Sequence, residues 1–528
     1  MSSSAASVQQ NSSNIPPLSR AEARQVVLAS SVGTVFEWYD FYLYGSLAVF
    51  FGGLFFPQGN PTAAFLASLA TFGAGFAVRP FGALVFGRIG DMVGRKYTFL
   101  VTIIVMGAST ALVGLMPTYE RVGILSPILL VTLRLAQGLA LGGEYGGAAT
   151  YVAEHAPDKH RGRDTSWIQT TATLGFFLSL AVILTTRLAV GEAEFKIWGW
   201  RIPFLISTLL LGVSVYIRLK LQESPVFAAL KAQGKTSKQP LRDSFADPAN
   251  LKIVLLALFG AAAGQGVVWY TGQFYALFFL QNALKVDFQN AYLMIAASLL
   301  IGTPFFVFFG SLSDRVGRKK IMMTGCLIAA LTYIPIFHGI THYANPTLET
   351  AIATSPVTVD AGNCGKACTD AREFLTKRGV PYTNAAAQTG DELVLKVGAT
   401  ETKGFDAKVY AQVLTTAGYP EKADPALINK PMVILLLTIL VLYVTMVYGP
   451  IAAFLVELFP TKIRYTSMSL PYHIGNGWFG GFLPLIAASV VVSTGNMYAG
   501  LYYPIGIALM SFVIGGLFIK ESYGKSLH

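Results

Sequence analysis

The chain has 528 residues, of which 53% are hydrophobic and only 13% are charged, and its mean hydropathy is +0.53. Soluble domains carry about 25% charged residues, so this composition excludes an ordinary water-soluble protein and indicates one surrounded largely by lipid. The net charge of +11 does not indicate nucleic-acid binding, because the basic residues lie in short stretches between apolar runs, as in the cytoplasmic loops of membrane proteins.

Apolar runs long enough to cross a bilayer follow one another along the chain. The first 25 residues are polar and contain no signal-peptide core, so we expect the first apolar run to remain in the mature protein. The pattern predicts an all-α membrane protein with twelve transmembrane helices, at 26–55, 63–86, 97–117, 125–153, 167–189, 201–221, 252–281, 289–311, 320–341, 431–456, 467–492 and 497–519.

The loops between these helices predict the domain organisation and the orientation. If the N-terminus is inside, the short cytoplasmic loops hold roughly eighteen Lys and Arg and the short external loops about five, so both termini are expected in the cytoplasm. The expected segments are a cytoplasmic tail (1–25), a six-helix bundle (26–221), a central cytoplasmic loop (222–250), helices seven to nine (251–341), an external insert (342–430), helices ten to twelve (431–519) and a second tail (520–528).

Two motifs occur twice in the chain. The run from Gly87 to Lys96 recurs from Gly310 to Lys319, and the spacing of Glu154, Pro157 and Arg161 recurs from Glu457 to Arg464. The two copies of the second motif are farther apart in the chain than the two copies of the first. This difference indicates an insertion in the second half, at the long segment between helices nine and ten. Two parallel six-helix halves with a site between them are the architecture of a secondary transporter.

The repeated motifs are candidates for a gate between the two halves. Glycines allow a tight turn between helices, and the aspartate can accept hydrogen bonds from a helix N-terminus or an arginine. The alternative is a turn that only sets topology, but the double occurrence at matched places favours a gate. The candidate gating residues are Gly87, Asp91, Gly94, Arg95, Gly310, Asp314, Gly317, Arg318, Glu154, Arg161, Glu457 and Arg464.

With these motifs the chain resembles the major facilitator superfamily. Further matches are Glu37-Trp-Tyr-Asp-Phe41, Arg79-Pro-Phe-Gly82, Arg134-Leu-Ala-Gln-Gly138, Gly142-Gly-Glu-Tyr145 and Trp198-Gly-Trp-Arg-Ile-Pro-Phe204. Together they resemble the bacterial metabolite:proton symporters, whose members carry 2-oxoglutarate, shikimate, citrate or zwitterionic osmolytes. The resemblance implies proton-coupled import across the bacterial inner membrane.

Several ionisable residues fall inside the predicted helices of the first half, where a charge is costly and is a functional candidate. Glu37 and Asp40 lie three residues apart on one helical face, Arg79 begins the motif before the first gate, and Arg134 and Glu144 lie in the fourth helix. At the repeat offsets, the second half carries Gly260, Ala263, Gly302, Leu437 and Val447 in their places. The fold therefore does not require these charges.

We assign these charges to coupling and binding. Asp40 or Glu37 is expected to carry the coupling proton with Arg134 competing for the carboxylate, and Glu144 is a further candidate. Arg79 or Arg134, with Gln137 beside it, is expected to bind a substrate carboxylate, because guanidinium pairs with carboxylate in a bidentate geometry. The alternative is a structural ion pair of Arg134 with Glu37 or Asp40.

Uncharged recognition is expected from the second half. Gln265, Trp269 and Gln273 lie at i, i+4 and i+8 in the seventh helix, and an amide facing lipid would be costly. The alternative for aromatic residues in spanning helices is packing or anchoring at the membrane interface. His473 is a possible second titrating group, although a structural hydrogen-bonded role is favoured.

The insert is expected to form a small α/β subdomain. It contains two strand-like runs (Pro356–Asp360 and Glu392–Val397) and two helix-like runs (Ala367–Arg378 and Ala407–Ala417). Cys364 and Cys368 lie in an oxidising compartment, where a disulfide is a possible structural clip. The segment faintly resembles a glutaredoxin, but its spacing is C-x-x-x-C. Two cysteines without a nearby histidine do not indicate a metal site.

The chain has no P-loop, zinc-binding histidine pair or nucleophile elbow, so we expect neither an enzyme nor a cofactor and infer that an ion gradient drives transport. We predict a proton symporter that imports a small organic acid, such as a di- or tricarboxylate or a shikimate-like acid. The alternatives are a symporter of a zwitterionic osmolyte, a proton-antiport exporter and a membrane sensor. The expected partners are solute, protons and lipid, without nucleic acid, and the expected functional unit is a monomer.

Overall fold

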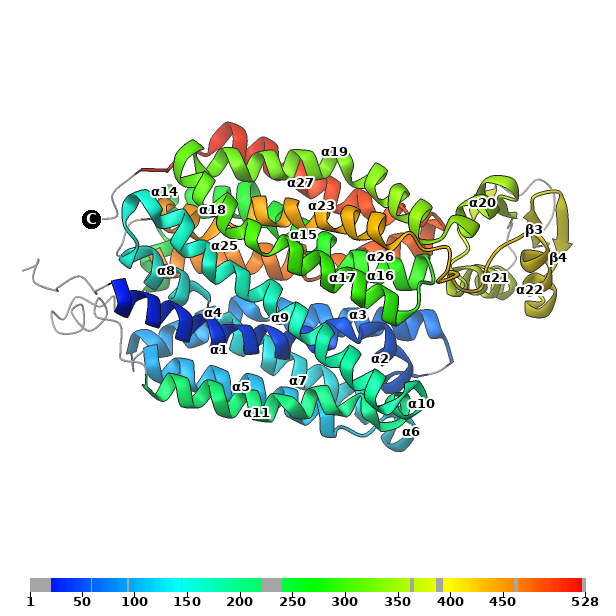
Figure 1. The fold of residues 1–528 in the computed structure, drawn as a ribbon, viewed down its shortest axis with the longest axis horizontal. Helices are drawn as coiled ribbons and strands as arrows, with labels where there is room; N and C mark the ends of the chain where they lie inside the picture. Colours follow the sequence, from blue (N-terminus) through cyan, green and yellow to red (C-terminus); the bar gives the residue numbers. More distant parts are fainter. Residues whose placement is uncertain are drawn as a thin grey trace, which may run out of the picture.

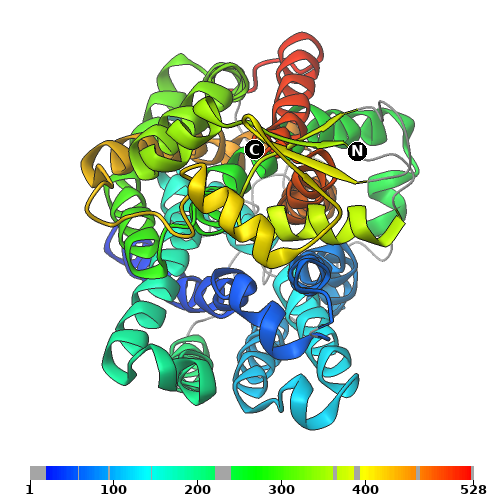
Figure 2. The ribbon, with the colours of Figure 1, turned by 90° about the vertical axis from the view of Figure 1, so that its right-hand side faces the viewer.

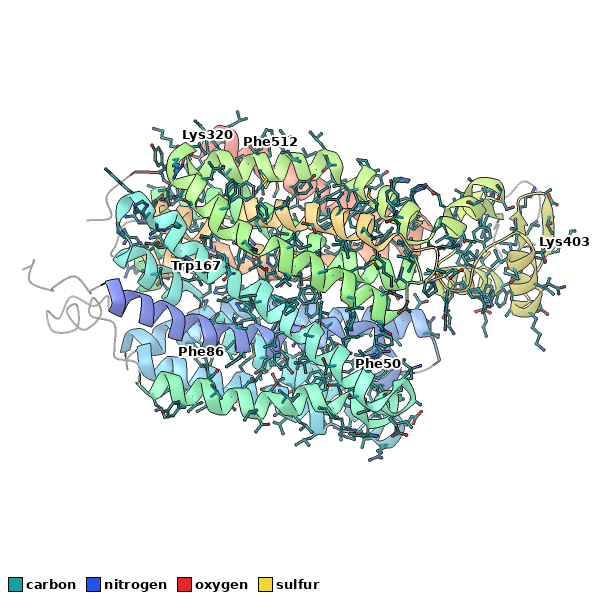
Figure 3. All side chains as sticks on the ribbon, in the orientation of Figure 1. Phe50, Phe86, Trp167, Lys320, Lys403 and Phe512 are labelled. Atoms are coloured by element: carbon teal, nitrogen blue, oxygen red, sulfur yellow. The ribbon has the colours of Figure 1, made fainter. Side chains whose placement is uncertain are left out.

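The computed structural model describes residues 20–57, 59–92, 95–143, 145–220, 240–360, 365–385, 393–459 and 464–524. Long helices run side by side along one axis, and a small α/β subdomain projects from one end (Figure 1). We call this the insert end, and the other end, where α1 begins, the opposite end. Side chains fill the space between the helices, and Lys403 lies on the subdomain, away from the bundle (Figure 3).

The first half of the bundle comprises the helices before residue 221. A short π-helical turn, η2 (Phe195–Gly199), precedes the last of them. Its helices are α1 (Arg20–Ser46), α2 (Ala48–Phe55), α3 (Pro61–Ala77), α4 (Arg79–Met92), α5 (Arg95–Leu115), α6 (Tyr119–Val122), α7 (Leu125–Gly142), α8 (Tyr145–His155), α9 (Arg161–Val190), α10 (Glu192–Glu194) and α11 (Arg201–Lys220).

The second half repeats this plan and contains several π-helical turns inside its long helices. Such turns are frequent at functional sites. The elements are α13 (Pro240–Phe245), α14 (Pro248–Ala257), η3 (Leu258–Ala262), α15 (Ala263–Tyr270), η4 (Thr271–Tyr275), α16 (Ala276–Phe278), η5 (Phe279–Ala283), α17 (Phe288–Gly302), α18 (Pro304–Val316), α19 (Arg318–Ala344), α23 (Lys430–Tyr448), α24 (Ile451–Leu458), α25 (Arg464–Ile474), η6 (Gly475–Gly480), α26 (Leu483–Thr494) and α27 (Tyr502–Phe518).

In the part of the chain that the structure describes, helices lie in each of the predicted spans. Among the described residues, nine helices are long and apolar enough to cross a membrane, and a pair bent by 58°, Glu192–Gly199 with Arg201–Tyr216, makes up to ten. The remaining predicted spans correspond to α1 with α2, and to α5, whose apolar stretch is short. Large apolar side chains on the outside of the bundle remain exposed, as expected for a surface that faces lipid; examples are Leu209, Leu331 and Leu517.

Helices begin or end a few residues away from two of the predicted loop boundaries. The central loop was predicted to extend to residue 250, but α13 and α14 begin before its end. The Asp247 carboxylate caps α14 by accepting a hydrogen bond from the Ala249 N–H (3.0 Å), and Pro248 fits the first turn, so this local signal starts a helix among polar residues. At the start of the insert, α19 continues to Ala344 rather than ending at 341.

The insert contains a four-stranded sheet in the order β2-β1-β3-β4. β1 (Val357–Asp360) pairs in parallel with β2 (Thr383–Ala385) and antiparallel with β3 (Val394–Val397), which pairs antiparallel with β4 (Thr400–Lys403). The helices are α20 (Pro346–Thr354), α21 (Gly365–Lys377) and α22 (Ala407–Thr416). The four predicted elements are present, whereas β2 and β4 were missed because they are short, polar and largely exposed.

The cysteines differ in state between the insert and the bundle. Cys368 is disulfide-bonded, and Cys364 lies outside the described residues. Cys326 is a buried free thiol in α19.

The two halves lie on either side of the bundle axis. Figure 2 looks onto the insert end, with the blue and cyan helices of the first half below the second half and the insert. The halves approach closely where α9 meets α18: a Cβ added to Gly162 would lie 2.6 Å from the Gly310 carbonyl oxygen, and a Cβ on Gly310 would lie 2.5 Å from Ser166 Cβ. Glycine is needed at both positions for this contact.

Candidate solute cavity and gate

A small cavity lies between the two halves near the middle of the bundle. Most of its wall comes from the first half, and the second half contributes a tyrosine from α23. The lining residues are Thr34, Glu37, Trp38, Arg79, Leu141, Tyr145, Ile168 and Tyr448. Glu37 and Arg79 place one acidic and one basic side chain in the same cavity, among aromatic rings.

Arg79 is a buried cation in this cavity, with only 1% of its surface exposed. Its guanidinium carbon lies 5.2 Å from the Trp38 ring centroid and 5.1 Å from that of Phe76. Within the described part of the chain, its Nε and Nη2 have no hydrogen-bond acceptor, and no carboxylate forms an ion pair with it. Since a buried charge without a partner is costly, this side chain is suited to an anionic ligand.

Tyrosines continue the cavity wall towards α25. The rings of Tyr145 and Tyr472 stack with centroids 3.6 Å apart, and the Tyr472 and Tyr448 hydroxyls are 2.8 Å apart. Gln169 donates a hydrogen bond from Nε2 to the Tyr145 hydroxyl (2.7 Å). His473 is fully buried, and neither ring nitrogen has a hydrogen-bond partner among the described residues.

The structure separates the two carboxylates that share a face of α1. Glu37 lines the cavity, whereas Asp40 is buried and accepts a hydrogen bond from the Ser207 hydroxyl of α11. The three-residue spacing turns the second side chain towards the α11 side of the helix. Ser207 was not singled out from the sequence, because a lone serine in an apolar helix carries no recognisable signal.

Arg134 does not form the ion pair that the sequence left open. Its Nη1 donates to Gln137 Oε1 (2.5 Å) and to the Phe41 carbonyl (3.3 Å), and its guanidinium carbon lies 4.4 Å from the Phe41 ring centroid. Gln137 in turn donates to Thr110 Oγ1 (2.7 Å). Neither residue lines the cavity, because ring faces and a neighbouring amide enclose the guanidinium within the first half. Glu144 lies outside the described residues.

The predicted stripe of Gln265, Trp269 and Gln273 is buried but is not in the cavity wall. Gln265 exchanges two amide hydrogen bonds with Asn476 (3.1 and 2.8 Å). Trp269 stacks on Tyr42 with centroids 5.3 Å apart, and Gln273 reaches across the halves to Thr173 Oγ1 (3.4 Å). These contacts make the stripe part of the contact between helices and halves.

Aromatic rings from both halves separate the cavity from the insert end. Phe274 of the second half lies 5.2 Å from Phe72 and 4.3 Å from Phe176 of the first half, centroid to centroid. Nearer the insert, the Tyr292 hydroxyl donates to the Ser46 carbonyl across the halves (2.5 Å). The interface is therefore closed on this side.

Charged side chains close the opposite end. Glu457 accepts hydrogen bonds from Arg161 of the first half (2.7 Å) and from Arg318 of the second (2.7 Å), and all three side chains are buried. Asp314 accepts the backbone N–H groups of Gly162 (2.8 Å) and Arg163 at the start of α9, and it pairs with Arg318 (2.8 Å). The second-half motif thus caps a helix of the first half.

The remaining gating candidates are less completely described. Gly317 has a φ of +105° between α18 and α19, a conformation that favours glycine. Arg464 donates from Nε to the Phe459 carbonyl (3.1 Å). Gly94 and the side chains of Asp91, Arg95 and Glu154 lie outside the described residues, as do the surroundings of Gly87.

Comparison with known proteins identifies relatives over most of the chain. A family model described as "Sugar (and other) transporter" matches residues 26–254. The "Inner membrane metabolite transport protein YhjE" of Escherichia coli K12 is 31% identical over 90% of both chains. The "Shikimate transporter" of the same strain is 33% identical over 75% of this chain and 89% of its own.

Other relatives have different printed substrates. The "Glycine betaine/proline/ectoine/pipecolic acid transporter OusA" of Dickeya dadantii is 29% identical over 96% of this chain and 84% of its own. In fold, the chain is similar to the major facilitator superfamily proton:xylose symporter XylE of E. coli. The TM-score is 0.64 at 15% sequence identity, and the match covers 96% of this chain and 98% of that chain.

Proposed function

Because the chain belongs to the sugar and metabolite transporters of the major facilitator superfamily, we propose that it imports a small carboxylate-bearing metabolite together with a proton. The transport occurs by alternating access of the central cavity, and the solute is an organic acid. The insert end faces outwards and the opposite end faces the cytoplasm, as the distribution of Lys and Arg between the loops favours.

The observation that carries this proposal is the Arg79 guanidinium, buried in the cavity with two nitrogen atoms that have no acceptor among the described residues. A substrate carboxylate would supply the missing charge and both acceptors in a bidentate pair. The rings of Trp38 and Tyr145 would exclude water from this pair and strengthen it.

Asp40 is the candidate for the coupling proton. It is a buried carboxyl on α1, the helix that also supplies Glu37 and Trp38 to the cavity wall. Gain or loss of its proton changes the charge of this helix, and such a change can bias a bundle that has two arrangements. Ser207 remains a hydrogen-bond partner in both protonation states, because a hydroxyl can donate or accept.

A zwitterionic osmolyte is the second candidate, favoured by Glu37 in the same cavity as Arg79. The carboxylate of a betaine would bind Arg79, while its quaternary ammonium would lie near Glu37 and the faces of Trp38 and Tyr145. Both candidate solutes would bind Arg79 through a carboxylate, but only the zwitterion would use Glu37 as a partner for its cation.

The test is uptake by proteoliposomes that contain the full-length protein, under an inward proton gradient, with and without protonophore. The labelled panel contains dicarboxylates, tricarboxylates, a shikimate-like acid and betaines. We expect one acid to accumulate, accumulation to stop with protonophore, and Asp40→Asn to abolish it while Ser207→Ala retains it. Accumulation that persists in Asp40→Asn would remove Asp40 from coupling.

Glu37→Gln separates the two candidates. Uptake of an organic acid should be retained or increased by this variant, since a negative charge leaves the cavity. Betaine uptake that the variant abolishes, without acid uptake by the parent protein, would establish the osmolyte transporter instead.

A further inference from the structure

A second pocket lies at the insert end, where three parts of the chain meet. Its walls come from the start of α3 in the first half, from η5 and α26 in the second half, and from residues 376–382 of the insert. It shares no lining residue with the central cavity. The pocket is therefore a separate site, and its walls belong to both halves of the transporter.

The pocket has an apolar body and a cationic end. Phe65, Phe279 and Val491 are among the apolar wall residues. At the other end, Lys285 donates from Nζ to the Lys377 carbonyl (2.8 Å), and no carboxylate pairs with it among the described residues. Asn282 Nδ2 is buried there and has no acceptor in the described part of the chain.

These groups are a cation without a carboxylate partner and a buried amide N–H₂ without an acceptor among the described residues. Lys285 lies outside the membrane-spanning helices, and burial, followed by the charge of Lys377, lowers its pKa to about 8. A ligand carboxylate would supply both the acceptor atoms and the negative charge, and a short hydrocarbon chain would fill the apolar body. A cationic ligand would instead add charge beside two lysines.

The insert is fastened firmly to the second half. Tyr382 donates from its backbone N–H to the Gly495 carbonyl (3.0 Å) and from its hydroxyl to the Val492 carbonyl (3.2 Å). Gly379 fits so closely against η5 that an added Cβ would lie 2.7 Å from the Ala283 carbonyl oxygen. The insert and the second half therefore form one wall that moves together.

The insert has weaker contacts with the first half. Asn60, which caps α3, donates from Nδ2 to Glu373 Oε2 (3.0 Å) at an exposed position. Pro61 and Phe65 of α3 complete the pocket. If the insert end opens by separation of the halves, this first-half wall moves away from Lys285 and Asn282.

We propose that this pocket binds a small amphipathic carboxylate, which bridges α3 to the insert and the second half and thereby holds the insert end closed. The occupied pocket inhibits uptake without occupying the central cavity. The inhibitory part rests on the proposed alternating-access function, whereas the binding part does not.

Binding is tested with octanoate as the probe and with octanol and octylammonium as matched neutral and cationic compounds. Calorimetry on the purified full-length protein in nanodiscs reports binding without any transported solute. We expect octanoate to bind, Lys285→Met to weaken binding at least tenfold, and Lys408→Met, at an exposed position on α22, to leave binding unchanged. Ala488→Phe should abolish binding by filling the pocket while retaining Lys285.

The site would be overturned if Lys285→Met and Ala488→Phe bound octanoate as strongly as the parent protein does. It would also be overturned if the parent protein bound octylammonium as strongly as octanoate, or if the folded protein bound no octanoate. Inhibition is then measured on uptake of the transported solute. We expect octanoate to slow uptake by the parent protein and not by Ala488→Phe. Octanoate that binds but leaves uptake unchanged would overturn the closing role, and failure of all solutes to be taken up would count against the proposed function alone.

Discussion

Two of the regions that hold buried charges in this molecule satisfy those charges to different degrees. At the opposite end, Glu457 accepts hydrogen bonds from Arg161, Arg318 and Ser522. In the central cavity, Arg79 has two nitrogen atoms without an acceptor in the described part of the chain. A satisfied network stabilises one arrangement of the halves, whereas an unsatisfied charge is a cost that a ligand can remove. Arg134 also has two nitrogen atoms without an acceptor among the described residues, but it does not line the cavity. The proposed gate and the proposed binding site therefore differ in how far their charges are satisfied, and access to the cavity distinguishes Arg79 from Arg134.

The largest effect on stability is expected from Arg318→Gln. This change leaves the Glu457 carboxylate buried with one cationic partner fewer, and breaking a buried ion pair in this way costs about 3–5 kcal/mol. Thermal unfolding of the purified protein measures the loss. Arg163→Gln is the control, because its ion pair with Asp164 is solvent-exposed. Equal stability of both variants would show that the buried network does not hold the halves together.

Arg79→Gln should give the reverse pattern. Removal of a buried cation without an ionic partner should leave stability unchanged or raise it, while uptake falls about a hundredfold, equivalent to about 2.7 kcal/mol of lost interaction with the solute. Uptake in proteoliposomes and thermal unfolding are measured on the same preparation. Arg121→Gln, at an exposed position, should change neither quantity. Loss of stability together with full uptake would make Arg79 a structural residue.

The helices were predictable from the sequence because the bilayer imposes a length and an apolar composition on each of them. In the second motif copy, the Asp314 carboxylate accepts the Gly162 N–H of the other half and pairs with Arg318, contacts that an aspartate before a glycine-containing turn can make. The short strands β2 and β4 were not predictable, because their residues are exposed and show no apolar alternation.

The direction of each side chain inside the bundle could not be predicted from the sequence, and this limited the prediction of the candidate site. The sequence placed Glu37 and Asp40 on one face of a helix, but three-residue spacing spreads two side chains around the axis, and only Glu37 lines the cavity. Arg134 could not be separated from Arg79 by sequence, because its enclosure by Gln137 and Phe41 depends on contacts between helices. Gln169 gave no signal of its own.

Lys285 is an intermediate case between the two regions, since its amine has a carbonyl partner and no carboxylate among the described residues. Its pKa is lowered to about 8 by burial and by Lys377, so the amine is mostly charged at pH 7 and mostly neutral at pH 9. Octanoate stays ionised over this range, and we expect its affinity to fall about tenfold from pH 7 to pH 9. Calorimetry at both values measures this. A similar fall for octanol, or a constant affinity for octanoate, would contradict a role for this amine.

The smallest effect is expected from Asp314→Ala, which tests whether the gate acts between the halves. The Asp314 carboxylate caps α9 of the other half, whereas the Asp287 carboxylate caps α17 within its own half by accepting the Asn290 N–H (3.0 Å). Each truncation removes a helix cap worth about 1 kcal/mol. Asp314→Ala also removes the contact with Arg318, but that contact lies within the second half and Arg318 keeps its pair with Glu457. Only Asp314→Ala should shift the equilibrium towards the conformation in which the opposite end is open, because the Asp314 cap forms only when the two halves meet. A loss of about 1 kcal/mol corresponds to a shift of about fivefold. Reactivity of a cysteine introduced at Ser166, where α9 packs against Gly310, reports the opening. Equal reactivity in Asp314→Ala and Asp287→Ala would mean that Asp314 stabilises its helix without gating the cavity.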